Sequence, residues 1–154
     1  MIKVQSADFC VGEEYSRLRQ NADSDGAIVT FTGLVRDFNQ DGSVSSMFIE
    51  HYPGMTEKSL MKICSEARMR WELGQISVIH RIGHLTASEQ IVFVGVTAKH
   101  RKEAFEGAQF IMDYLKNSAP LWKKEGTLSG MKWVDSKTSD EQALTRWYED
   151  KQVS

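Results

Sequence analysis

The stretch from Ile91 to Lys124 constrains the fold of this chain more than any other part of the sequence. Residues 91–98 (IVFVGVTA) are mostly apolar and β-branched, which is typical of a strand covered on both faces. From residue 101 onward the apolar positions recur with helical spacing. The apolar face of this helix comprises Ala104, Ala108, Ile111 and Leu115, with Phe105 and Met112 beside them. The sequence therefore predicts a buried strand that leads into a long amphipathic helix.

Cationic side chains lie at both ends of this predicted helix. Residues 99–101 (Lys-His-Arg) stand where the strand passes into the helix N-terminus. The partial positive charge and unpaired N–H groups of a helix N-terminus suit a phosphate or a carboxylate. Lys116 lies near the opposite end of the helix, and the pair Lys123–Lys124 follows it.

The length of the helix limits how these cations can act together. His100 and Lys116 are roughly 24 Å apart along the helix axis, which is too far for one small-molecule site. One end alone could be functional, the two ends could belong to different sites, or two protomers could share one site. We favour the shared site, which makes a homodimer part of the prediction.

Length and composition predict a single domain over residues 1–154 and argue against several classes of protein. The net charge of −2 gives no general attraction to nucleic acid, so any anion must be bound locally. Cys10 and Cys64 are far apart in the sequence, which fits two free thiols in a reducing compartment. The sequence does not decide between free thiols and a disulfide. No apolar run reaches the length of a membrane span, and the N-terminus lacks a signal-peptide core. We expect a cytoplasmic protein without membrane or nucleic-acid partners.

The first third of the chain predicts short helices and strands. A strand is expected at Ile2–Gln5, and a polar helix at Gly12–Gln20 would be anchored by Tyr15 and Leu18. Two further strands, at Ala27–Val35 and Ser46–Tyr52, are expected to pair antiparallel across a hairpin loop at residues 37–43. In the second of them, residues 47, 49 and 51 share one face, and residues 48, 50 and 52 share the other.

The rest of the chain alternates helices and strands. Thr56 is expected to cap a helix that Gly74 ends. Its apolar face comprises Leu60, Ile63, Cys64, Ala67 and Trp71. A strand at Gln75–Ile82 and a connection at Gly83–Ser88 come next. After Pro120 a hairpin of Leu121–Leu128 and Met131–Val134 is expected, then a helix that begins at a capping box of Ser139 and Gln142 and ends near Tyr148. This order favours an α+β or mixed-sheet α/β fold.

Two histidine positions invite a functional interpretation that the pattern does not favour. His80 and His84 have the spacing of metal ligands on a helix, but their surroundings predict a strand, where four residues span roughly 13 Å. We therefore predict no metal site. Glu50 and His51 could form an acid–base pair, but neighbours on a strand point to opposite faces.

Arg36 and the two lysines remain open from the pattern alone. Arg36 follows a predicted strand, and together with His100 and Arg101 it would form an anion clamp; a solvated charge is an equally good interpretation. Lys116 and Lys123 flank an apolar Pro-Leu-Trp segment, where a lysine could become a base or a nucleophile. The pattern favours the simpler view that a lysine there compensates the helix dipole.

Several motifs together point to a known family. These are residues 29–36 (VTFTGLVR), 50–57 (EHYPGMTE), 79–83 (IHRIG), 92–97 (VFVGVT) with His100–Arg101, 110–116 (FIMDYLK) and 120–123 (PLWK). With them, the chain resembles the large, catalytic subunit of molybdopterin synthase from Val11 to about Trp147. The resemblance implies an α/β-hammerhead fold of the α+β class, with mixed strands, a long amphipathic helix and an additional small antiparallel sheet.

The resemblance also implies a reaction and its partners. Two such chains would form a central homodimer, with a small ubiquitin-like sulfur-carrier subunit at each end of a heterotetramer. The C-terminal Gly-Gly thiocarboxylate of the carrier would enter a pocket and transfer sulfur to cyclic pyranopterin monophosphate (precursor Z). The product is the dithiolene of molybdopterin, and the enzyme is a sulfurtransferase that needs no cofactor or metal.

The roles of individual residues follow from the resemblance as well. Lys116 and Lys123 match the catalytic lysines of the family; we expect Lys116 to be the acid–base or transient covalent group and Lys123 to hold the carrier tail or intermediate. The substrate-binding residues implied are Arg36, His100, Arg101, Lys124, Glu125, Leu34, Val35 and Lys137. His100 and Arg101 are expected from the second protomer. Leu34 stands where some members carry lysine, and Lys137 where an arginine is expected, which keeps the charge but loses the guanidinium fork.

Two alternatives stay open beside this reading. The chain could be a non-catalytic module that binds a phosphate ligand or an acidic protein through its cationic cluster. It could also be a small phosphohydrolase that uses Arg36 and His100, which would need no sulfur carrier.

Overall fold

The computed structural model describes residues 1–36, 46–127, 130–133 and 138–149, and helices and strands alternate along them. The strands are β1 (Ile2–Gln5), β2 (Ala27–Leu34), β3 (Ser46–His51), β4 (Leu73–Arg81), β5 (Gly83–Thr86), β6 (Gln90–Ala98), β7 (Leu121–Thr127) and β8 (Gly130–Trp133). The helices are α1 (Val11–Gln20), α2 (Met55–Arg70), α3 (Arg101–Ser118) and α4 (Thr138–Glu149). This is the α+β class that the sequence predicts.

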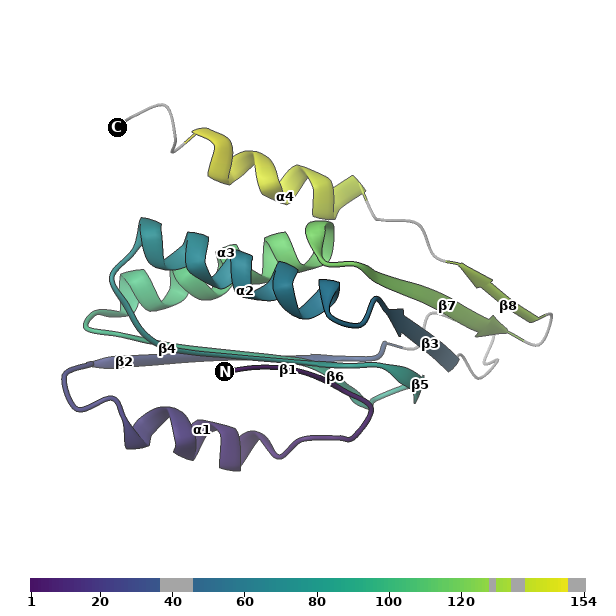
Figure 1. The fold of residues 1–154 in the computed structure, drawn as a ribbon, viewed down its shortest axis with the longest axis horizontal. Coiled ribbons are helices and arrows are strands. Elements are labelled where there is room, and N and C mark those ends of the chain that lie inside the picture. Colours follow the sequence, from purple (N-terminus) through teal and green to yellow (C-terminus); the bar gives the residue numbers. More distant parts are fainter. Residues whose placement is uncertain (37–45, 128–129, 134–137, 150–154) are drawn as a thin grey trace.

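The first sheet has the strand order β1-β4-β6-β2, and β6 lies inside it. β6 runs antiparallel to β4 on one side and to β2 on the other, while β1 runs parallel to β4 at the edge. Helix α1 lies on one face of this sheet, and α2 and α3 lie on the other (Figure 1). Residues 91–98 are consequently all buried, which confirms the predicted central strand.

The second sheet has the order β5-β3-β7-β8 and is antiparallel throughout. It continues from the first sheet at the corner between β4 and β5, where Gly83 adopts φ +87°, a conformation that favours glycine. Ile49 of β3 stands opposite both Gly83 of β5 and Lys123 of β7. The predicted hairpin after Pro120 is confirmed as the pair β7–β8.

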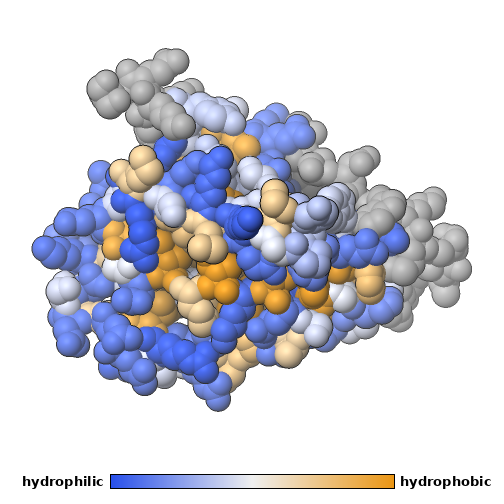
Figure 2. Space-filling model, in the orientation of Figure 1, coloured by the Kyte–Doolittle hydropathy of each residue, from blue (hydrophilic) through white to orange (hydrophobic). Residues whose placement is uncertain are grey.

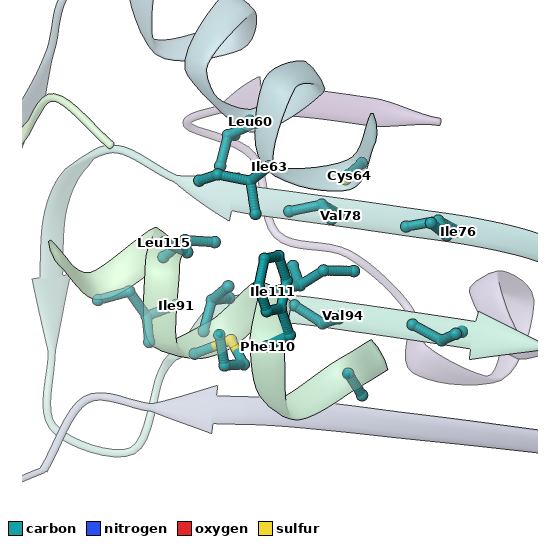
Figure 3. Packing of buried hydrophobic residues seen from close by; sticks show 14 of the residues in the cluster. Leu60, Ile63, Cys64, Ile76, Val78, Ile91, Val94, Phe110, Ile111 and Leu115 are labelled. Atoms are coloured by element: carbon teal, nitrogen blue, oxygen red, sulfur yellow. The ribbon is translucent and has the colours of Figure 1, made fainter. Parts of the chain in front are cut away.

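The main core lies between the first sheet and the two helices α2 and α3. Figure 3 shows Leu60, Ile63 and Cys64 of α2 above Val78, while Ile111 and Leu115 of α3 face Val94 and Ile91. The buried positions predicted for α2 and for the face of α3 are confirmed with two exceptions: Trp71 follows the end of α2 and is only partly buried, and Phe105 is 61% exposed. Phe110 is fully buried although the sequence did not single it out. Burial of these apolar side chains is the dominant stabilising contribution to the fold.

Helix α4 is fixed to α3 through a buried indole. Trp147 is 1% exposed, packs edge-on against Trp71 and Phe110, and donates a 2.8 Å hydrogen bond from Nε1 to Oδ2 of Asp113. Asn117 donates from Nδ2 to the backbone oxygen of Asp140, 2.7 Å away. These contacts hold the C-terminal half of α3, on which Lys116 lies.

One prediction about strand pairing and one about a connection are wrong. β2 does not pair with β3: β2 pairs along its length with β6, whereas both edges of β3 are occupied by β5 and β7 of the second sheet. The predicted hairpin loop at residues 37–43 lies outside the described residues. The predicted connection Gly83–Ser88 contains β5, a strand of 4 residues that is too short to show an alternating pattern.

Several local predictions also need correction. The N-cap of α2 is Gly54, and Thr56 instead lies buried in the first turn. Helix α2 ends at Arg70, and Gly74 lies inside β4. In α1, Leu18 is buried as expected, but Tyr15 is 40% exposed and Glu14 is buried in its place. Ser139 lies within α4, which begins one residue earlier, at Thr138.

The face shown in Figure 2 has hydrophilic residues at its margins and hydrophobic residues across its middle. In the part of the chain that the structure describes, no helix combines the length and apolarity needed to cross a membrane. Cys10 is exposed and Cys64 is buried, and both are free thiols.

Replacing Trp147 with phenylalanine tests the contact between α3 and α4. The variant Trp147→Phe keeps an aromatic ring but removes the donor to the buried Asp113 carboxylate. We expect the free energy of unfolding in urea to fall by about 1–3 kcal/mol. In a double-mutant cycle with Asp113→Asn the two losses should be non-additive; additive losses would contradict the contact.

Candidate active site

The turn between α3 and β7 is held in place by a buried threonine. Thr56 donates from Oγ1 to the backbone oxygen of Pro120 at 2.9 Å and accepts from the backbone N–H of Tyr52 at 3.0 Å. Lys116 lies in the last turn of α3 and Lys123 lies in β7, so this turn separates the two lysines. The β3–α2 connection therefore fixes where α3 ends and where β7 begins.

The register of β7 places Lys123 and Lys124 on opposite faces of the second sheet. Lys123 stands opposite Ile49, which is 1% exposed, and Lys124 stands opposite Phe48. Because residues directly opposite in a sheet share a face, Lys123 belongs to the inner face with Ile49. Lys124 belongs to the outer face, where its Nζ lies 3.8 Å from Oε1 of Glu50. Within one chain, the structure does not bring Lys124 to the same face as Lys123.

A buried histidine lies near the two lysines. His80 of β4 is 2% exposed, and its Nδ1 lies 2.8 Å from the backbone oxygen of Arg81. Burial lowers the pKa of His80 to about 4, and the positive charges of Lys123 and Lys116 lower it further against the opposing effect of the bond to Arg81. His80 is therefore a neutral imidazole at physiological pH. The sequence interpretation treated His80 only as a metal candidate and missed this position.

Arg36 lies at the same end of the first sheet as Lys116. Ala27 of β2 pairs with Ala98 of β6, and Leu34 pairs with Gln90, so Arg36 follows β2 at the end where β6 begins. Helix α3 returns over the sheet from the other end, and Leu115 packs in the same cluster as Ile91. We call this end, with Arg36, His80, Lys116 and Lys123, the lysine end.

His100 and Arg101 lie at the opposite end of the sheet. His100 is the N-cap of α3 and Arg101 its first residue, and both side chains are exposed. Seven residues of β2 separate the two ends, which corresponds to roughly 24 Å. Within one chain Arg36 therefore lies far from His100 and Arg101, so an anion clamp of these three residues would need the second protomer that the sequence analysis expects. We call this end the His-Arg end.

The remaining substrate-binding predictions fall at several places. Val35 is buried and Leu34 is 58% exposed at the end of β2. The backbone of Glu125 in β7 stands opposite that of Met47 in β3. Lys137 lies outside the described residues. Among the described residues, no three His, Cys, Asp or Glu side chains form a group that could hold a metal ion.

The comparisons with known proteins agree on one family. The family model described as MoaE protein matches residues 4–118. The molybdopterin synthase catalytic subunit of Escherichia coli (strain K12) is 57% identical over 146 residues, which cover 95% of this chain and 97% of that protein. The chain belongs to the MoaE family. Its resemblance to molybdopterin synthase catalytic subunits, stated from the motifs, is therefore confirmed.

Solved structures of similar proteins have the same fold. The MoaE protein from Burkholderia ambifaria MC40-6 has a TM-score of 0.84 and 45% identity, and the match covers 96% of this chain and 97% of that one. A complex of subunits 1 and 2 of the molybdopterin-converting factor from Helicobacter pylori 26695 has a TM-score of 0.73 at 17% identity, covering 88% of this chain and 91% of that one. The second likeness supports the fold alone. The match to the MoaE family model ends at Ser118, so β7 and its lysines lie beyond the matched residues.

The buried His80 predicts a dependence of stability on pH. Its pKa of about 4 in the folded chain lies below its unfolded value of 6.5, so the unfolded chain takes up the proton first as the pH falls. The contribution of His80 to the free energy of unfolding is complete above pH 6.5. It falls by about 3 kcal/mol as the pH drops toward 4. We expect urea unfolding at several pH values to show this loss in the wild type.

The variant His80→Phe is the control for that measurement. It removes the titrating group, so the loss between pH 6.5 and pH 4 should be smaller by the same amount. Hydrogen bonds from Gln90 and from the Thr86 backbone lower the pKa values of Asp8 and Glu89, respectively. These carboxylates therefore lose their contribution to the free energy of unfolding at lower pH, in the wild type and in His80→Phe alike. An unchanged slope in His80→Phe would contradict the assignment to His80.

Proposed function

We propose that this chain catalyses the sulfur transfer of molybdopterin synthase. A small carrier subunit with a C-terminal Gly-Gly thiocarboxylate supplies the sulfur, and cyclic pyranopterin monophosphate (precursor Z) accepts it. Membership of the MoaE family supports the reaction. The observation that carries the proposal is the placement of Lys116 and Lys123 with Arg36 at one end of the sheet, some 24 Å by strand length from His100 and Arg101.

A homodimer would complete the site. β2 is an edge strand of the first sheet, and its Phe31 and Leu34 are 43% and 58% exposed. Phe105, on the first turns of α3, is 61% exposed. Apolar side chains along an open sheet edge are typical of a surface that a partner covers. With a two-fold axis beside β2, the β2 strands of the two protomers would run in opposite directions. The lysine end of one protomer would then meet the His-Arg end of the other.

The residues at the shared site divide into two tasks. Arg36, with His100 and Arg101 of the partner subunit, provides guanidinium and imidazole donors for the substrate phosphate. Lys116 delivers and removes protons as the cyclic phosphate opens and carbonyl oxygen leaves as water, or forms a transient covalent bond. Lys123 holds the carrier tail or the intermediate. Lys124 and Glu125 follow Lys123 in β7. Because Lys124 belongs to the other face of the sheet, it would contact the ligands only at the border of the pocket. Glu125, Leu34 at the end of β2, Val35 after it and Lys137 before α4 would contact the ligands at the same border.

The chemistry asks mainly for orientation and for stabilisation of negative charge. A thiocarboxylate is already a good nucleophile, so its attack needs placement more than activation. Ammonium and guanidinium groups that are fixed before the reaction stabilise the developing charge without reorganisation. The carrier would dock as a separate small subunit, one at each end of a heterotetramer, and the chain would work as one domain in the cytoplasm.

A single-turnover assay with Lys116→Ala tests this proposal. Purified chain is mixed with precursor Z and thiocarboxylated carrier, and molybdopterin is quantified. Loss of an acid–base group should reduce the rate by about 10²–10⁴-fold while the affinity for the carrier stays near that of the wild type. Lys62→Ala, which removes an exposed lysine on α2, is the matched control and should react at the wild-type rate.

Three results would overturn parts of the proposal. Normal turnover by Lys116→Ala would show that Lys116 has no chemical role. Absence of product from the wild type, despite a verified complex with the carrier, would favour a module that binds without catalysis. Release of inorganic phosphate from precursor Z without any carrier would favour the phosphohydrolase.

A further inference from the structure

His80 occupies a position that the proposed function does not use. On β4 its side chain alternates with that of Ile79, which packs with Leu18 and Phe93 in the smaller core cluster. His80 therefore shares its face with Val78 and belongs to the side of the sheet that α2 and α3 cover. It is the only polar side chain among the buried residues Val78, His80 and Val92, which are neighbours in β4 and β6.

The strand connections bring Lys123 close to this imidazole. His80 stands three residues before Gly83, and Gly83, Ile49 and Lys123 lie side by side across β5, β3 and β7. Two strand spacings separate Gly83 from Lys123, which is about 10 Å between their backbones. Lys123 points to the inner face with Ile49, and Ile49 belongs to the same core cluster as Val78. The extended side chain of Lys123 spans most of the distance that remains between its backbone and the imidazole of His80.

The hydrogen bond to Arg81 determines which nitrogen of His80 can accept. A backbone carbonyl only accepts, so Nδ1 must carry the proton that bonds to the oxygen of Arg81 at 2.8 Å. In the neutral imidazole, Nε2 then carries the lone pair. A buried nitrogen lone pair is favourable only when a donor reaches it. The ammonium of Lys123 is such a donor.

We propose that His80 is a positioning residue for Lys123, whose ammonium group it holds by accepting a hydrogen bond at Nε2, directly or through one water. This inference rests on the proposed function for the meaning of the contact, but the contact itself does not depend on it. Because the imidazole is neutral, it orients a cation without adding a third positive charge beside Lys116 and Lys123. Lys123 is thereby directed toward the carrier tail, and Lys116 stays free to move protons.

Nitrogen NMR of the histidine ring tests the contact without any assay of activity. The chain is labelled with ¹⁵N-histidine and measured at pH 7 as wild type and as Lys123→Ala, Lys116→Ala and Lys62→Ala. We expect the pattern of an Nδ1–H tautomer, and an Nε2 resonance that moves by several ppm in Lys123→Ala and stays in place in Lys62→Ala. An Nε2 resonance that does not respond to Lys123→Ala, or that responds only to Lys116→Ala, would overturn the proposal.

Variants at His80 test the consequence for catalysis. His80→Gln can place an amide oxygen where Nε2 lies, whereas His80→Phe keeps a ring without an acceptor. At equal affinity for the carrier, we expect single-turnover rates about tenfold lower for His80→Phe and near the wild type for His80→Gln. Val78→Ala, on the same strand and face, controls for lost packing and should lower stability without changing the single-turnover rate.

Each outcome of this test decides one claim. If His80→Phe does not fold, His80→Asn replaces it, because its shorter amide keeps the donor to Arg81 but presents no acceptor at the Nε2 position. A fully active His80→Phe or His80→Asn would overturn the positioning role. If the wild type forms no product, the proposed function fails, and the NMR experiment still decides whether His80 holds Lys123.

Discussion

Burial of β6 on both faces is the constraint on which the rest of this structure depends. Its neighbours β4 and β2 occupy both edges, and helices cover both faces, so the chain can leave only at the strand end. It leaves at Ala98 and returns as α3, whose 18 residues span about 27 Å. The length of this one helix separates His100 and Arg101 from Lys116. No rearrangement of side chains can close such a gap within one protomer.

In the proposed function, one chain therefore provides only half of the site. Arg36 and Lys116 lie at the same end because β2 runs antiparallel to β6 and α3 runs back along it. The second sheet then adds Lys123 from its inner face, since β7 begins where the turn fixed by Thr56 ends. In this proposal, a phosphate ligand at the lysine end would lack the side chains of His100 and Arg101 until another protomer supplies them.

The sequence predicted those elements whose pattern is long, and it failed where pairing or burial depends on distant segments. The apolar run of the nine-residue strand β6 and the helical periodicity of α3 are both long enough to be recognised. The separation of β2 from β3 is not visible, because each strand is amphipathic whichever partner it finds. Likewise, the anchoring of α4 by Trp147 depends on Asp113, which lies 34 residues earlier.

In the candidate site, too, some features follow from the local sequence and others depend on distant segments. Helical rise alone was enough to separate Lys116 from His100, and the family resemblance, not the pattern, singled out both lysines. Which face of β7 each of Lys123 and Lys124 takes requires the register with β3. The proximity of His80 to Lys123 runs through three strands, β5, β3 and β7, and no spacing in the sequence encodes it.

Heterodimers assembled from two inactive chains would test the shared site most directly. Chains carrying Lys116→Ala and Arg101→Ala, each with its own affinity tag, are co-expressed, and the mixed dimer is isolated. A site built from both protomers leaves one intact site in this dimer, which should show about half the wild-type turnover. The mirror dimer, one wild-type chain with one chain carrying both substitutions, should then be inactive. If the first dimer were inactive and the mirror dimer active, each chain would contain its own complete site, contrary to the structure proposed.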